Sequence, residues 1–100
     1  LPLFCTYDVH MRFAWDKANL EHLARHDLTA EETEQVIAGP LVFIAFQQSS
    51  DEFRRVAVGI TDDGKCLTVV YLLRGGFIRV ITAFPATNRR RRMFEERTGL

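Results

Sequence analysis

Residues 41–84 read LVFIAFQQSSDEFRRVAVGITDDGKCLTVVYLLRGGFIRVITAF, and this stretch decides the fold. Its apolar segments, separated by polar or glycine-containing turns, span residues 41–47, 53–61, 65–73 and 77–84. Asp62-Asp63-Gly64 is a strong signal for a tight hairpin turn, and Gly75-Gly76 marks the next one. The stretch therefore predicts four consecutive antiparallel strands. The first of them is almost wholly apolar, which indicates that both of its faces are covered.

Residues on either side of this meander predict one more strand and three helices. Residues 11–15 form a short strand candidate, and residues 17–26 carry the apolar spacing of a helix. A second helix begins after residue 29 and ends at Gly39-Pro40. The side chains predicted to cap the helix starts are Asp16, Thr29 (in a capping box with Glu32) and Thr87. The order β-α-α-β-β-β-β-α predicts an α+β fold with the helices on one sheet face and a site on the other.

The length and composition indicate one domain over residues 1–100, with a core at residues 11–96 and an N-terminal extension at residues 1–10. No apolar run is long enough to cross a membrane. The two cysteines, Cys5 and Cys66, do not form a disulfide framework and are typical of free thiols in a reducing compartment. We therefore expect a cytoplasmic protein.

The net charge of zero conceals two halves of opposite sign. Residues 1–52 hold three basic and nine acidic side chains, whereas residues 53–100 hold ten basic and four acidic ones. Four consecutive arginines, Arg89 to Arg92, stand at the start of the last predicted helix, where the helix dipole disfavours cations. This placement favours a polyanionic or acidic partner over a merely solvated face, and Arg89 and Arg92 share one side of the helix.

Arg79 occupies the middle of the last strand. Alternation places Ile78, Val80, Thr82 and Phe84 toward the helix-packed core, so Arg79 is predicted on the open face. It either forms an ion pair with a carboxylate of the acidic half or binds phosphate through two hydrogen bonds. On the neighbouring strand, Arg55 faces the same surface if the register allows, and Arg54 is the alternative.

His26 ends the first predicted helix. A histidine at this position gains from the helix dipole, and the same imidazole is suited to proton transfer near neutral pH. His22 and His26 have the i,i+4 spacing of metal ligands, but no third ligand is near in sequence, so no metal site and no cofactor are predicted.

The chain resembles the BrnT family of bacterial toxins. The matching features are Phe13-Ala14-Trp15-Asp16, Asn19, Arg25-His26, then Ile78-Arg79-Val80-Ile81, Ala83, Pro85-Ala86-Thr87 and a basic last helix that ends in acids. The resemblance implies a RelE-like fold and a metal-independent endoribonuclease that inhibits translation. It also implies a cognate DNA-binding antitoxin that forms a hetero-oligomer with the toxin.

For a ribonuclease of this type, we predict catalytic roles for Arg79 and His26, and RNA binding by the basic residues Arg55, Arg74, Arg89 and Arg92. The chain departs from the family pattern at Asp27, where glycine is usual, and at Phe84, where arginine is usual. Arg90 and Phe94 replace the usual glutamate and tyrosine of the last helix. These departures support an alternative function, a catalytically impaired module that binds RNA or the antitoxin.

Overall fold

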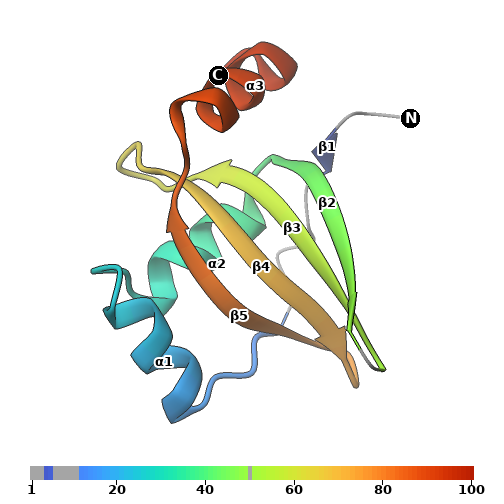
Figure 1. Cartoon of the computed structure of the whole chain (residues 1–100). Coiled ribbons are helices and arrows are strands. Elements are labelled where there is room, and N and C mark those ends of the chain that lie inside the picture. Colours follow the sequence, from blue (N-terminus) through green and yellow to red (C-terminus); the bar gives the residue numbers. More distant parts are fainter. Residues whose placement is uncertain (1–3, 6–11, 50) are drawn as a thin grey trace.

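The computed structural model describes residues 4–5, 12–49 and 51–100, and it has the predicted α+β architecture (Figure 1). Its elements are β1 (Phe4–Cys5), α1 (Lys17–Ala24), α2 (Ala30–Ala38), β2 (Leu41–Ser49), β3 (Glu52–Ile60), β4 (Cys66–Arg74), β5 (Phe77–Pro85) and α3 (Asn88–Thr98). The strands form one antiparallel sheet in sequence order. The predicted meander and fold class are therefore confirmed.

The two predicted glycine turns join the central strands. Gly64 has a φ of 91°, and the Thr61 N–H donates to the Lys65 carbonyl at 2.9 Å, which closes the β3–β4 hairpin. Gly75 and Gly76 have φ angles of 57° and 82° between β4 and β5. Positive φ angles at consecutive residues suit the right-handed twist of a two-residue hairpin, which explains the choice of glycine there.

The N-terminal pairing differs from the prediction. Phe13 forms only an isolated parallel bridge with Ile78, through the Ala14 N–H to the Ile78 carbonyl (2.9 Å) and the Ile78 N–H to the Arg12 carbonyl (2.8 Å). The strand predicted at residues 11–15 is thus reduced to a bridge at the outer edge of β5, and Met11 lies outside the described residues. The first strand is β1, which pairs with the start of β2.

Helices α1 and α2 pack on one face of the sheet. Leu23 of α1 and Val36 and Ile37 of α2 are buried against the inward side chains of β3, β4 and β5. The predicted capping box of α2 is present, with the Glu32 N–H donating to Thr29 Oγ1 at 3.2 Å. A β-carbon added at Gly59 would lie 2.7 Å from Val36 Cγ1, so glycine is what allows α2 to approach β3 this closely.

Helix α3 packs on the opposite face, so the prediction that all helices share one face was wrong. Phe94 is buried to 1% exposure against Val42 and Val58, with Met93 beside it. Figure 1 shows α3 at one end of the sheet, away from the β2–β3 and β4–β5 hairpin ends. Both faces of β2 are therefore covered only near its start, where Leu41 and Val42 are buried, and Phe46 is 56% exposed.

A register shift in β5 changes which side chains face the core. Val80 lies opposite Tyr71 and Thr82 lies opposite Val70, so Ile81 is an extra residue between the two pairs. Ala83 consequently joins the buried cluster under α1 and α2. The prediction that Thr82 and Phe84 face this core was wrong, because the extra residue of the bulge reverses which face the later residues of the strand point to.

Candidate active site

Arg79 lies on β5 and is held by Asp16, the residue that caps α1. Arg79 Nη2 donates a hydrogen bond to Asp16 Oδ2, and the Asn19 N–H donates to Asp16 Oδ1 at 2.8 Å. The hydrogen bond from Asn19, and then the contact with Arg79, lower the pKa of the Asp16 carboxyl. Of the two alternatives for Arg79, the ion pair with a carboxylate of the acidic half is therefore confirmed.

The strand register separates Arg55 from Arg79. Arg55 lies opposite Tyr71, whereas Arg79 lies opposite Leu72. Because successive residues of a strand point to opposite faces, Arg55 faces the side that carries α1 and α2, and Arg79 faces the side that carries α3. Arg54, the alternative left open by the sequence, is the arginine that shares the face of Arg79.

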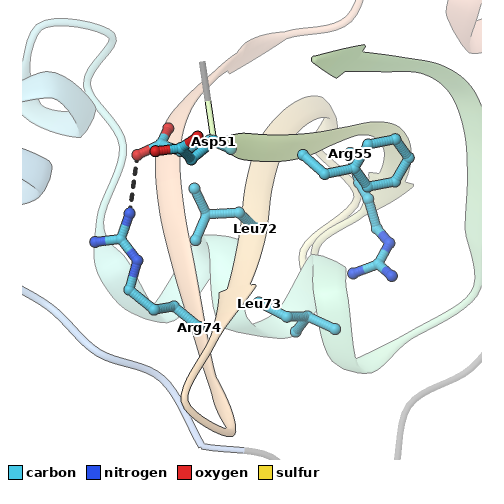
Figure 2. Close-up of a pocket in the computed structure, with 7 residues that line it drawn as sticks. Asp51, Arg55, Leu72, Leu73 and Arg74 are labelled. Atoms are coloured by element: carbon cyan, nitrogen blue, oxygen red, sulfur yellow. Dashed lines mark hydrogen bonds and ion pairs between the residues drawn. The ribbon is translucent and has the colours of Figure 1, made fainter. Parts of the chain in front are cut away.

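Glu52 joins two arginines of this second face. Arg54 Nη2 and Arg74 Nη2 lie 2.9 Å and 2.8 Å from its carboxylate oxygens. These contacts lower the pKa of the Glu52 carboxyl, with the Arg54 hydrogen bond as the largest cause. Glu52 and Arg74 border a hollow of about 240 Å³. Figure 2 shows Arg74 on one side of this hollow and Arg55 on the other. Arg74, predicted to bind RNA, is thus already paired with an acid.

His26 lies just beyond the end of α1, where the chain turns sharply. The backbone N–H of His26 donates to the Leu23 carbonyl at 3.0 Å, and the next residue, Asp27, has a φ of 55°. The exposed imidazole of His26 lies near the end of β5, with its ring centroid 6.1 Å from that of Phe84. His26 and Arg91 of α3 line the same hollow of about 430 Å³, together with Lys65 and Cys66.

The two residues predicted to be catalytic are not in one site. Asp16, the partner of Arg79, and His26 are at opposite ends of α1, about 15 Å apart at 1.5 Å per residue. Arg79 and Phe84, the neighbour of His26, are separated by about 16 Å along β5 at 3.3 Å per residue. A single phosphate cannot contact both side chains in this conformation.

The arginine run of α3 is distributed around the helix. Thr87 caps it as predicted, with the Arg90 N–H donating to Thr87 Oγ1 at 3.2 Å. Arg90 Nη1 reaches back to Thr68 Oγ1 of β4 at 3.3 Å. Arg89 and Arg92 both line a hollow of about 890 Å³ between α3 and β2, in agreement with the side they were predicted to share.

Arg91 and Lys65 are the arginine and the lysine of the His26 hollow, and neither was predicted as a site residue. Helix periodicity could have indicated that Arg91 faces a different site from Arg89. At 100° per residue, Arg91 lies about 160° from Arg89 around the helix axis. Lys65 Nζ forms an ion pair with Glu32 Oε2 at 2.6 Å, which raises the pKa of the lysine. Within the described ranges, the Arg91 guanidinium has no hydrogen-bond or ion-pair partner.

The model of one protein family, described as "Ribonuclease toxin, BrnT, of type II toxin-antitoxin system", matches residues 15–90. The chain belongs to the BrnT family. It is accordingly a toxin of the ribonuclease type, with RNA as substrate and an antitoxin protein as partner. The match includes Asp16, His26 and Arg79 and ends in the first turn of α3. Neither curated proteins nor solved structures gave a match.

In the part of the chain that the structure describes, no three histidine, cysteine, aspartate or glutamate side chains are grouped as metal ligands would be. Among the same residues, none of the helices has the length and apolar character needed to span a membrane.

Proposed function

We propose that this toxin is a metal-independent endoribonuclease whose reaction centre is the hollow between the end of α1 and the start of α3. The observation that carries the proposal is that His26 and Arg91 line one hollow. An imidazole exchanges protons near neutral pH, and a guanidinium binds a phosphoryl group through two hydrogen bonds. The hollow thus supplies the two functions that metal-free RNA cleavage requires.

The proposed reaction is an attack by the 2′-hydroxyl of RNA on the adjacent phosphorus. His26 accepts the 2′-hydroxyl proton as the 2′-oxygen forms its bond to phosphorus. Arg91 stabilises the negative charge that develops on the phosphoryl oxygens. The bond from phosphorus to the 5′-oxygen then breaks, and the 5′-oxygen takes a proton from water. The products are a 2′,3′-cyclic phosphate and a free 5′-hydroxyl.

Arg79 has a different role in this proposal. Its guanidinium holds the capping carboxylate of α1, and α1 ends at Ala24, two residues before His26. We assign Arg79 as a positioning residue that fixes α1 on the sheet. Arg89 and Arg92 line the hollow between α3 and β2 and are proposed to hold the RNA backbone, with Arg74 and Arg55 as more distant cationic contacts.

A cleavage assay in a chelating buffer tests the proposal. We expect His26→Ala and Arg91→Ala each to slow the cutting of single-stranded RNA by about 10²-fold or more. The matched controls are His22→Ala on α1 and Arg97→Ala near the end of α3, which are exposed and outside the hollow. Parent-like rates for both hollow variants, or loss of activity on chelation, would overturn the proposal.

One observation favours a second function, that of a binding module with impaired catalysis. Phe94 takes the position of the usual tyrosine and is buried, while Arg90 takes the position of the usual glutamate and contacts Thr68. Neither side chain offers a group for proton transfer. If the parent protein binds RNA but releases no cyclic phosphate product in the same assay, this second function is the correct one.

The proposed function also involves a partner protein and a cellular compartment. We propose that the antitoxin is DNA-binding and forms a hetero-oligomer with this chain in the cytoplasm. An acidic segment of the antitoxin would compensate the unfavourable charge of Arg89 and Arg92 at the start of α3. Co-expression with the adjacent gene product, followed by size-exclusion chromatography, tests for a stable complex.

A further inference from the structure

Three phenylalanine rings form a column at the end of the sheet farthest from α3. The ring centroids of Phe43 and Phe46 are 6.2 Å apart with 17° between their planes. Those of Phe46 and Phe53 are 5.2 Å apart with 11° between the planes. The rings come from β2 and β3 and lie on the face that α1 and α2 cover elsewhere.

This column ends in solvent. Phe43 is partly buried against the core, but Phe46 and Phe53 are 56% and 49% exposed. The two exposed rings already stack on one another, so what they still present is flat ring surface rather than a deep apolar pocket. Phe53, the last ring of the column, also borders the hollow of about 240 Å³.

A cation lies beside the column. Arg55 is opposite Phe46 in the register and also borders the hollow. Among the described residues its guanidinium has no hydrogen-bond or ion-pair partner. Figure 2 shows it directed away from the Arg74 side of the hollow. The carboxylate of Glu52 is neutralised by Arg54 and Arg74, and Asp51 is the acid of the lining that has no ion pair with any residue the structure describes.

We infer that Phe46, Phe53 and Arg55 form a subsite for single-stranded RNA, in which a nucleobase stacks on Phe53 and Arg55 contacts a neighbouring phosphate. Flat aromatic faces next to a cation are how sequence-tolerant single-strand sites are built, because every base has a π-face. The inference rests on the proposed ribonuclease function for its ligand. The subsite is remote from His26. Ile60 at the far end of β3 pairs with Cys66, which lines the His26 hollow, and Phe53 lies about 23 Å from Ile60 along the strand.

The test measures binding rather than cleavage. The probe is a fluorescently labelled 2′-O-methyl RNA oligonucleotide of about 12 nucleotides, which lacks the attacking 2′-hydroxyl. We expect Phe53→Leu, which removes the π-face and keeps the apolar volume, to weaken binding at least about fivefold. Phe53→Trp should restore parent-like affinity. The control is Phe77→Leu, because Phe77 is 39% exposed but lies on the opposite face.

Two further arms separate the base contact from the phosphate contact. On an abasic oligonucleotide of the same length, Phe53→Leu should bind as the parent does. Arg55→Gln should lower the slope of log affinity against log salt by about one. Circular dichroism and thermal melts verify that each variant is folded.

Equal affinity of parent and Phe53→Leu for the base-containing probe, or no binding of that probe by the parent, would overturn the inference. Loss of antitoxin capture by Phe53→Leu with unchanged RNA affinity would also overturn it, by making the column a protein contact. If His26→Ala cleaves RNA normally while Phe53→Leu still lowers the affinity for the probe, the proposed reaction centre is wrong and the subsite is retained.

Discussion

Asp16 connects the start of α1 to the middle of β5 through Arg79. One oxygen of its carboxylate accepts the Asn19 N–H and caps the helix, and the other accepts the Arg79 guanidinium. The two residues are 63 positions apart in sequence. The contact therefore fixes the helix that precedes His26 against the edge of the sheet.

Breaking this contact should loosen α1 without removing its cap. We expect Asp16→Asn, which retains an oxygen for the Asn19 N–H, and Arg79→Met each to lower the melting temperature by a few degrees. The double variant should lose less than the sum of the two single losses, because both remove one shared interaction. Additive losses would show that the pair does not couple α1 to β5.

The same contact predicts a pH dependence of stability. The carboxyl pKa of Asp16 is below its usual 3.8 in the folded state. Its contribution to stability is therefore fully present above pH 4 and is lost as the pH falls through the folded-state pKa. As the pH falls below 4, the unfolding free energy should decrease less steeply in Asp16→Asn than in the parent. Superimposable acid limbs would contradict this prediction.

Gly59 should tolerate no side chain. An added β-carbon would lie 2.7 Å from Val36 Cγ1 and 3.2 Å from the Pro40 carbonyl oxygen. Val36 is fully buried and β-branched, so it cannot swing away. We expect Gly59→Ala to cost about 1–3 kcal/mol of unfolding free energy in urea denaturation. Gly39→Ala is the matched control, because its added β-carbon would meet atoms only at 3.5 Å or beyond.

Asp27 should be improved by glycine. Its φ of 55° lies in the left-handed region at the end of α1, where a β-carbon is disfavoured. We expect Asp27→Gly to raise the unfolding free energy by roughly 0.5–1 kcal/mol and Asp27→Ala to lower it. A destabilised glycine variant would mean that the Asp27 carboxylate contributes more, through its attraction to Lys65, than its backbone costs.

The arginine run should show opposite effects on stability and on RNA binding. Arg89 is in the first turn of α3, which has no acidic residue. We expect Arg89→Glu to stabilise the protein by about 0.3–1 kcal/mol at low salt through the helix dipole. The same change should lower the affinity for RNA and make that affinity less dependent on the salt concentration.

The matched control for that experiment is Arg97→Glu in the last turn of α3. There the helix dipole favours a cation, so the substitution should destabilise the protein instead. If Arg89→Glu left RNA affinity and its salt slope unchanged, the arginine run would not be part of the RNA-binding surface.

The sequence by itself determined the three helices and the four strands of the meander, because their signals are local. Strand alternation, the glycine turns and the Asp16, Thr29 and Thr87 caps depend on residues a few positions apart. The charge asymmetry and the resemblance to BrnT toxins are likewise properties of order and spacing, and the family match over residues 15–90 agrees with them.

Only the tertiary structure decided which of these residues meet. The pairing register placed Arg54, not Arg55, on the face of Arg79, and no local signal carries a register across strands. The packing of Phe94 placed α3 on the second face, which brought Arg91 to the hollow of His26. These outcomes depend on which apolar surfaces bury one another across the whole chain, and that is why the sequence could name His26 and Arg79 but not separate them.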